Sequence, residues 1–303
     1  MADTDFRGII PPVLTPLADG DSLDYQGLEN VVRRLVSGGV QGLFILGTTG
    51  EGPSLSYPLR RDMIQETLRM VGGEIPVMVG ITDTSMIESV RLADFAAENG
   101  AGAVVVAPPC YHPIDQDDLL RYLDALAAKL PLPIFLYNMP SHCKTIYALP
   151  TLRRVFENPK FVGLKDSSDD MDYFQKAAEL IVPQKRLTLL IGPEDKLPLA
   201  LSLGAHGGIC GGAHLLPRLF VRIVDAHRGG EKVRLDRLTR RLGDLQRVYD
   251  AGGSFLKSMK AAMSILGVCR NVFAEPLHPL GNAAFDAVRR ALIESRIDAS
   301  TLE

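Results

Sequence analysis

Short apolar runs return every 25 to 35 residues or so along the first two thirds of the chain, and helical patterns fill the intervals. The runs that read as strands are 8–14, 42–47, 76–81, 103–108, 133–138, 161–166, 187–192 and 206–211. Between them, stretches such as 25–37, 58–71, 85–99 and 116–129 carry apolar residues three and four apart, as amphipathic helices do. Strands that are apolar on both faces belong to a parallel sheet covered by helices. Eight such units predict an α/β fold, a closed (β/α)8 TIM barrel rather than an open doubly wound sheet.

After residue 212 the pattern is helical only, over 214–228, 232–249, 255–266 and 282–297. We expect the barrel with the active site to occupy 1–229 and a C-terminal helical extension, packed on the barrel, to occupy 230–303. No Ser/Pro/Gly-rich linker or charge block separates the two parts, so they should form one compact unit.

Charge and residue composition limit the kinds of molecule that the protein can be expected to bind. A formal charge of −3 offers no basic excess for nucleic acid or an anionic membrane, and no apolar run approaches the ~18 residues of a membrane span. The start of the chain lacks a secretory signal pattern, which favours a cytoplasmic protein. The cysteines form no CxxC pair and the histidines show no ligand spacing, so we expect no metal and a small-molecule ligand.

Lys165 ends a run, 161–164, that otherwise reads as a buried strand. Burying an ammonium costs several kcal/mol unless it is paired or neutral. Asp166 should point to the opposite face, because neighbours in a strand alternate. A surface lysine is the simpler interpretation. The alternative is a desolvated amine that attacks a carbonyl and forms a Schiff base, which then accepts electrons from a breaking carbon–carbon bond.

Such chemistry needs a proton carrier and an anchor for the substrate. Tyr137 ends the preceding strand, and a phenol can carry the proton, although strand-end tyrosines are often core residues. The turn 47–50, Gly-Thr-Thr-Gly, offers two hydroxyls and backbone N–H groups that could converge on a carboxylate, or it is a plain connection. In a barrel these strand ends meet at one mouth.

Together these motifs resemble the family of dihydrodipicolinate synthase and N-acetylneuraminate lyase. The likeness rests on IIPPVLTPL (9–17), GTTGE (47–51), PPCYHP (108–113), YNMP (137–140), GLKDSS (163–168), LGAHGGICG (203–211) and SMKAAMSILG (258–267), and covers nearly the whole chain. The resemblance implies a metal-independent, cofactor-free class I lyase or aldolase that binds pyruvate or another 2-oxo acid and an aldehyde. It also implies a homotetramer, a dimer of dimers.

The resemblance assigns roles to particular residues. It implies that Lys165 forms the imine, that Tyr137 shuttles protons with Thr48, and that Tyr111 reaches into the neighbouring subunit's site. Substrate contacts are expected from Thr49, Gly47, His142, Gly192, Glu194, Asp195 and Ile209.

Two positions depart from the branches of the family. The synthase branch carries an arginine where this chain has His142, and an imidazole lacks the bidentate fork of a guanidinium. The sialic-acid lyases carry an acidic pair, matched by Glu194 and Asp195, and a serine where this chain has Gly211. An acidic pair at a helix start is also common without any ligand.

We therefore expect a pyruvate-dependent lyase or aldolase resembling N-acetylneuraminate lyase or a 2-keto-3-deoxy sugar acid aldolase. Dihydrodipicolinate synthase and a 2-keto-3-deoxy acid dehydratase remain alternatives within the enzymes. A non-catalytic module that binds a 2-oxo acid is the alternative of a different class.

Overall fold

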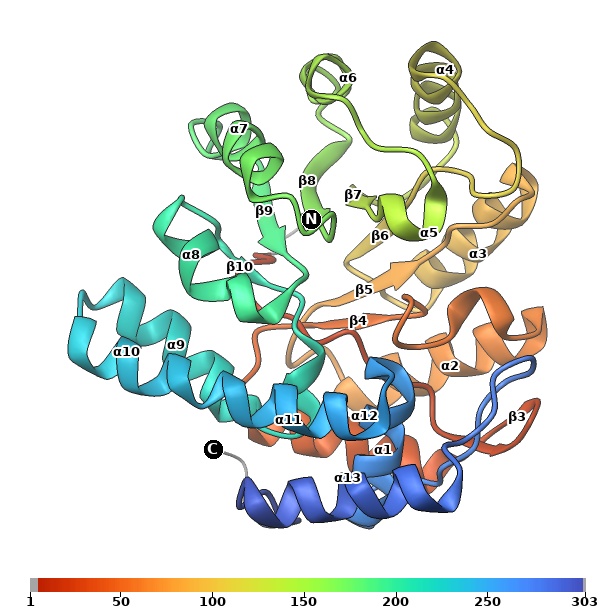
Figure 1. Cartoon of the computed structure of the whole chain (residues 1–303). Helices are drawn as coiled ribbons and strands as arrows, with labels where there is room; N and C mark the ends of the chain where they lie inside the picture. Colours follow the sequence, from red (N-terminus) through yellow and green to blue (C-terminus); the bar gives the residue numbers. More distant parts are fainter. Residues whose placement is uncertain (1–4, 302–303) are drawn as a thin grey trace.

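A parallel sheet closed on itself forms the centre of the computed structural model, which describes residues 5–301 (Figure 1). Its strands are β1 (Gly8–Ile9), β4 (Leu43–Ile45), β5 (Val77–Gly80), β6 (Ala103–Val106), β7 (Ile134–Asn138), β8 (Phe161–Asp166), β9 (Thr188–Ile191) and β10 (Gly207–Gly208). The strand order is β1-β10-β9-β8-β7-β6-β5-β4. A parallel bridge between Pro12 and Phe44 joins the chain after β1 to β4 and closes the ring. The predicted (β/α)8 barrel is confirmed.

Helices surround the sheet. They are α1 (Tyr25–Ser37), α2 (Tyr57–Val71), α3 (Met86–Glu98), α4 (Gln116–Ala127), α6 (Leu149–Val155), α7 (Met171–Ile181), α8 (Leu197–Ser202) and α9 (Pro217–Arg228), with the short α5 (Pro140–Cys143) after β7. Aspartates cap several starts: Asp24, for example, accepts a hydrogen bond from the Gly27 amide at 3.0 Å. A hairpin of β2 (Leu17–Asp19) and β3 (Ser22–Leu23), which sequence patterns did not reveal, precedes α1.

Some predicted elements are longer than the observed ones. The run 8–14 forms only the two-residue strand β1, because Pro11 and Pro12 have no N–H to donate to a ladder. The run 206–211 forms only β10, since the chain turns into a 3₁₀ helix, η3 (Gly211–His214). The predicted helix 232–249 is two helices: at the break, the amides of Arg241 and Asp244 bond to carbonyls three residues back.

Side chains that alternate along the strands fill the barrel interior. They include Ile10, Phe44, Met78, Ala103, Val105, Phe135, Tyr137, Leu190 and Ile209, with Phe6 among them. The opposite faces of the same strands join a larger core shared with the helices. This division explains why the strands read as continuously apolar.

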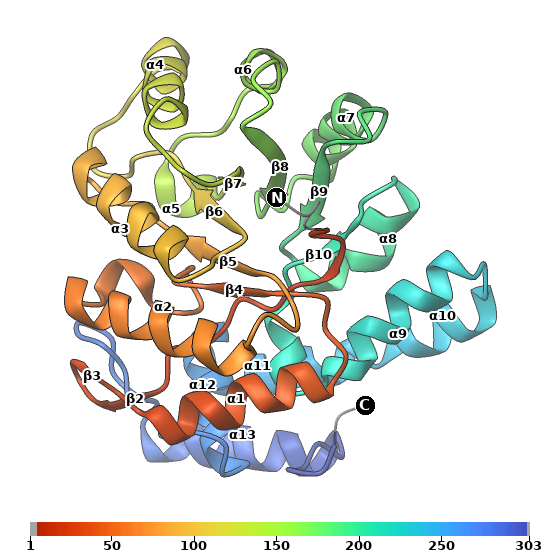
Figure 2. The ribbon, with the colours of Figure 1, turned by 180° about the vertical axis from the view of Figure 1, so that it is seen from behind.

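The C-terminal helices α10 (Lys232–Arg240), α11 (Leu242–Gly252), α12 (Phe255–Ile265) and α13 (Asn282–Glu294) lie together along one side of the barrel (Figures 1 and 2). Two contacts link this layer to loops at the strand ends: Tyr249 of α11 reaches Glu194, and Lys260 of α12 reaches Glu51 in a buried contact. The helical extension is thus observed, while the boundary at 229/230 stays a prediction. No helix among residues 5–301 has the length and apolar character needed to span a bilayer.

Candidate active site

Strands β7 and β8 place two pairs of residues opposite one another. The register aligns Tyr137 with Lys165 and Asn138 with Asp166. Tyr137 belongs to the core inside the barrel. Asp166 instead accepts a hydrogen bond from the Asn138 side chain at 2.7 Å and another from the Ser168 hydroxyl at 2.9 Å. Lys165 and Asp166 therefore face opposite sides, as strand alternation predicts.

Lys165 is buried against two aromatic faces. Only 4% of the residue is exposed. Its Nζ lies 3.9 Å from the centroid of the Tyr137 ring and 5.0 Å from that of the Phe44 ring. Within residues 5–301 no carboxylate forms an ion pair with it. A buried amine without a counter-ion at a strand end is unusual for a structural lysine.

Tyr137 connects this amine to the loop that follows β4. Its hydroxyl lies 3.3 Å from the Thr48 hydroxyl, and either group can donate the hydrogen bond. The Phe44 ring packs edge-on against the Tyr137 ring, with centroids 6.3 Å apart. The structure thus brings together the hydroxyls of Thr48 and Tyr137 and the amine of Lys165, which come from three different strand ends.

The 47–51 loop is built from tight backbone contacts. The amide of Glu51 donates to the Thr48 carbonyl, and the amide of Gly52 donates to the Gly47 carbonyl, each at 3.1 Å. A Cβ added at Gly52 or Gly80 would lie 2.2 or 2.4 Å from the Leu46 carbonyl oxygen, so only glycine fits at either position. This packing fixes the backbone that carries Thr48.

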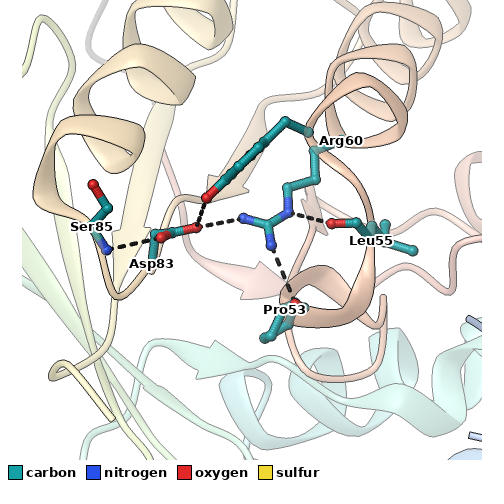
Figure 3. Close-up of polar contacts among 6 residues, drawn as sticks. Pro53, Leu55, Arg60, Asp83 and Ser85 are labelled. Atoms are coloured by element: carbon teal, nitrogen blue, oxygen red, sulfur yellow. Dashed lines mark hydrogen bonds and ion pairs between the residues drawn. The ribbon is translucent and has the colours of Figure 1, made fainter. Parts of the chain in front are cut away.

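Arg60 of α2 holds the segment that follows this loop (Figure 3). Its guanidinium donates to the carbonyls of Leu55 at 3.0 Å and Pro53 at 3.3 Å, and pairs with the Asp83 carboxylate at 3.0 Å. Asp83 in turn accepts from the Ser85 amide at 2.9 Å. The planar guanidinium therefore ties the loop after β4 to the loop after β5.

Glu51 and Lys260 form a fully buried ion pair, with both side chains 0% exposed. The second Glu51 oxygen accepts from the Ala274 amide at 2.9 Å. Desolvation lowers the pKa of Lys260, and the Glu51 charge opposes that shift. Sequence reasoning quoted both motifs that contain these residues but gave neither residue a role. A lysine within the apolar pattern 258–267 was the available signal.

Two predicted residues lie at the surface. Tyr111 is 76% exposed and packs edge-on against the His112 ring at 5.0 Å. His142 is exposed on α5, with its Nδ1 3.0 Å from the Ser141 hydroxyl. Neither contacts the Thr48, Tyr137 and Lys165 group through an observed hydrogen bond among the described residues.

Glu194 and Asp195, the predicted acidic pair, lie in two different environments. Glu194 accepts from the Gly212 amide and the Tyr249 hydroxyl, each at 2.7 Å, and burial raises its pKa. Asp195 is exposed and pairs with Lys196 at 2.8 Å. Both oxygens of Glu194 therefore serve contacts within the protein.

The other predicted substrate contacts lie near strand ends. Gly192 follows β9, and Ile209 is buried inside the barrel after β10. Thr49 is buried next to Thr48.

Histidines do not assemble a metal centre in the described part of the chain. Between residues 5 and 301 no group of three or more His, Cys, Asp or Glu is arranged to hold an ion. His214 instead accepts from the Leu14 amide at 3.1 Å and lies 2.8 Å from the Gly211 carbonyl, and burial lowers its pKa to about 4. It is a neutral structural residue at neutral pH.

Known proteins share this architecture over its whole length. A crystal structure of dihydrodipicolinate synthase from Bacteroides thetaiotaomicron is 42% identical and has a TM-score of 0.93, with 96% of this chain and 99% of that chain covered. YagE of Escherichia coli K12, a prophage protein solved in complex with pyruvate, is 26% identical, with a TM-score of 0.91 and coverage of 96% and 99%. The probable 2-dehydro-3-deoxy-D-pentonate aldolase YjhH of Escherichia coli K12 is 29% identical over 89% of this chain and 91% of its own length.

The sequence model of the Dihydrodipicolinate synthetase family matches residues 5–295. That range includes the barrel and all four C-terminal helices, α10 to α13. The chain belongs to the dihydrodipicolinate synthetase family.

Proposed function

We propose that Lys165 forms a Schiff base with pyruvate or a related 2-oxo acid and that the chain reversibly cleaves or forms the adjacent carbon–carbon bond. Enzymes of this family are class I lyases and aldolases, and this chain is one of them. The observation that carries the assignment to Lys165 is its buried Nζ, 3.9 Å from the Tyr137 ring centroid.

The proposed reaction begins when the Lys165 amine attacks the C2 carbonyl of the 2-oxo acid. A proton moves to the former carbonyl oxygen through the hydroxyls of Tyr137 and Thr48, which lie 3.3 Å apart, and water leaves. In the cleavage direction the C4 hydroxyl gives its proton to the Tyr137–Thr48 relay, the protonated imine accepts the electron pair of the C3–C4 bond, and an aldehyde departs. The resulting enamine takes a proton, and hydrolysis releases pyruvate and the free lysine. The imine is the electron sink, so this scheme needs no metal.

The carboxylate of the 2-oxo acid is assigned to the 47–50 turn, where Thr48 and Thr49 offer hydroxyls and the backbone offers amides. The buried Glu51–Lys260 pair holds the residue that follows this turn, and Arg60 holds the next segment through the carbonyls of Pro53 and Leu55. A rigid turn supports catalysis because it fixes the substrate before the chemical step.

For the aldehyde side, we favour a 2-keto-3-deoxy sugar acid or a sialic-acid-like substrate. The reason is His142, which stands where the synthase branch carries a carboxylate-binding arginine, beside the hydroxyl of Ser141. These groups suit neutral hydroxyls better than a second carboxylate. Dihydrodipicolinate synthesis is the second candidate, because a protein described as that synthase is 42% identical.

We also propose that the enzyme is a cytoplasmic homotetramer of tight dimers in which Tyr111 enters the neighbouring subunit's site. Support comes from the exposure of Tyr111, 76%, at the mouth-side loop after β6. Light scattering with size-exclusion chromatography tests the assembly. A fully active monomer would refute the role of Tyr111.

Borohydride trapping tests the central proposal. Incubation with pyruvate and sodium borohydride should attach one reduced pyruvate, located at Lys165 by peptide mass spectrometry. The variant Lys165→Ala should give no adduct while keeping its circular dichroism spectrum. An unmodified wild-type protein would refute the Schiff base, and tight 2-oxo acid binding without an adduct would favour the binding module.

The two candidate substrates are then separated by product. Aspartate semialdehyde with pyruvate tests the synthase, and 2-keto-3-deoxy sugar acids and N-acetylneuraminate test the lyase. The variant His142→Arg should improve the synthase reaction and impair sugar-acid cleavage if this position selects the substrate. Dehydration of a sugar acid without pyruvate release would favour the dehydratase.

A further inference from the structure

The residue just before the 47–51 loop and the last residue of the loop have a backbone conformation that side-chain-bearing residues rarely adopt. Leu46 has φ 58° and Glu51 has φ 56°. Both values lie in the left-handed region, where a Cβ crowds the backbone. The loop therefore needs contacts from outside its own segment to keep this shape.

The contacts at Glu51 come from the far end of the chain. Lys260, on α12, pairs with one carboxylate oxygen, and the Ala274 amide donates to the other at 2.9 Å. The Lys260 Nζ also lies 4.5 Å from the centroid of the Phe273 ring. Both partners of the ion pair are excluded from water. Two residues from the C-terminal part of the chain, Lys260 and Ala274, thus fix one loop residue.

A continuous set of contacts leads from this ion pair to the reactive amine. The Glu51 amide donates to the Thr48 carbonyl at 3.1 Å, so the position of Glu51 sets the backbone of Thr48. The Thr48 hydroxyl lies 3.3 Å from the Tyr137 hydroxyl, and the Tyr137 ring lies against Lys165. A displacement at Glu51 is therefore transmitted to the two hydroxyls of the proton relay.

Stability alone is a weak reason for such an ion pair. Removing two charges from water costs so much that apolar residues of similar shape often stabilise a protein equally well. The ion pair does fix the position of the Glu51 carboxylate, because one oxygen is held by a cation and the other by an amide. We propose that Glu51 and Lys260 are positioning residues for the Thr48–Tyr137 relay, so that α12 supports the relay through Lys260 alone. The inference rests on the proposed role of Lys165.

The first test is Glu51→Asp. Aspartate is tolerated in the left-handed region and keeps the charge, but its arm is one methylene shorter. It cannot reach both Lys260 and the Ala274 amide unless the loop moves. We expect the rate constant of pyruvate trapping, measured at saturating pyruvate, to fall about tenfold or more, because small displacements of catalytic groups cost this much.

The second test is the double variant Glu51→Gln/Lys260→Met, which removes both charges at similar side-chain volume. It should stay folded and trap pyruvate slowly. The matched control is Ser258→Ala on the same helix: Ser258 is 0% exposed, and its hydroxyl donates to the Tyr249 carbonyl at 3.0 Å, away from the loop. This control should trap at the wild-type rate.

Rate and amplitude separate positioning from general destabilisation. Chains that stay misfolded lower the fraction that can be trapped, whereas a displaced relay lowers the rate constant and leaves the final fraction complete. Wild-type rate constants in Glu51→Asp and in the folded double variant would overturn the inference. Absence of any adduct in the wild type would instead refute the Schiff base itself.

Discussion

Replacing Asp166 with asparagine tests how the barrel holds β7 and β8 together outside the catalytic face. Asp166 is 1% exposed and accepts hydrogen bonds from the side chains of Asn138 and Ser168. Burial raises the pKa of its carboxyl from 3.8 to about 6, and these hydrogen bonds only partly offset the shift. The folded chain thus holds this proton more tightly than the unfolded chain.

The sign of the pH dependence follows from that difference. The stabilising contribution of the protonated carboxyl is complete below about pH 4 and is lost as the pH rises through about 6. A shift of roughly 2 pKa units at about 1.4 kcal/mol each corresponds to about 3 kcal/mol. Asparagine has nearly the same shape and no proton to lose, so the free energy of unfolding of Asp166→Asn minus that of the wild type should rise by about 3 kcal/mol between about pH 4 and pH 7, on top of a pH-independent cost of pointing an amide NH₂ at a donor.

Urea unfolding at a series of pH values measures this difference. The free energies of unfolding of the variant and the wild type are subtracted at each pH, which removes the contribution of every other titrating group. Asp236→Asn, at an exposed position on α10, controls for the loss of one carboxylate. A difference between Asp166→Asn and wild type that stays constant with pH would refute the burial argument, and a difference of opposite slope would require an unrecognised positive partner.

Three further substitutions test other parts of the site. Tyr137→Phe removes the hydroxyl that faces Thr48 and should lower the rate of imine formation about 10²- to 10⁴-fold without changing the melting temperature; a wild-type rate would exclude proton transfer by this phenol. Arg60→Met leaves the largely buried Asp83 carboxylate without its cation and should lower the free energy of unfolding in urea by about 3 kcal/mol. An unchanged free energy of unfolding would contradict the conclusion that Arg60 ties the two loops together. Glu194→Gln points an amide NH₂ at a hydrogen-bond donor and should lower the free energy of unfolding by about 1–3 kcal/mol. If the Michaelis constant for the aldehyde or sugar acid rises while the free energy of unfolding is unchanged, Glu194 binds substrate instead.

The barrel could be predicted from the sequence because the pattern that identifies each strand is local. A strand buried on both faces must be apolar at every position, and polar residues at its carboxyl end stand out. Lys165, Tyr137 and Thr48 were identified in this way, and β7 and β8 bring the first two into register. Strand ends in a parallel barrel must meet, so proximity followed from the fold.

The contacts that support the 47–51 loop were not predictable from the sequence, because they join residues that are far apart and share no local pattern. Glu51 and Lys260 are 209 positions apart, and a lysine inside an apolar helical pattern does not name its partner. The left-handed backbone of Glu51 is likewise a product of surrounding packing rather than of propensity. The break at Arg241 has the same origin, since a periodic pattern continues across it.

The alignment of the Tyr137-Asn138 and Lys165-Asp166 dipeptides ties the proposed chemistry of Lys165 to correct strand pairing. If β8 slipped by one residue, every side chain on it would exchange faces, so a carboxylate would enter the interior and the amine would leave it. Such a barrel would lose the Asn138–Asp166 hydrogen bond and the proposed nucleophile in the same event. Recovery of trapping during refolding therefore times the moment at which these two strands find their native alignment.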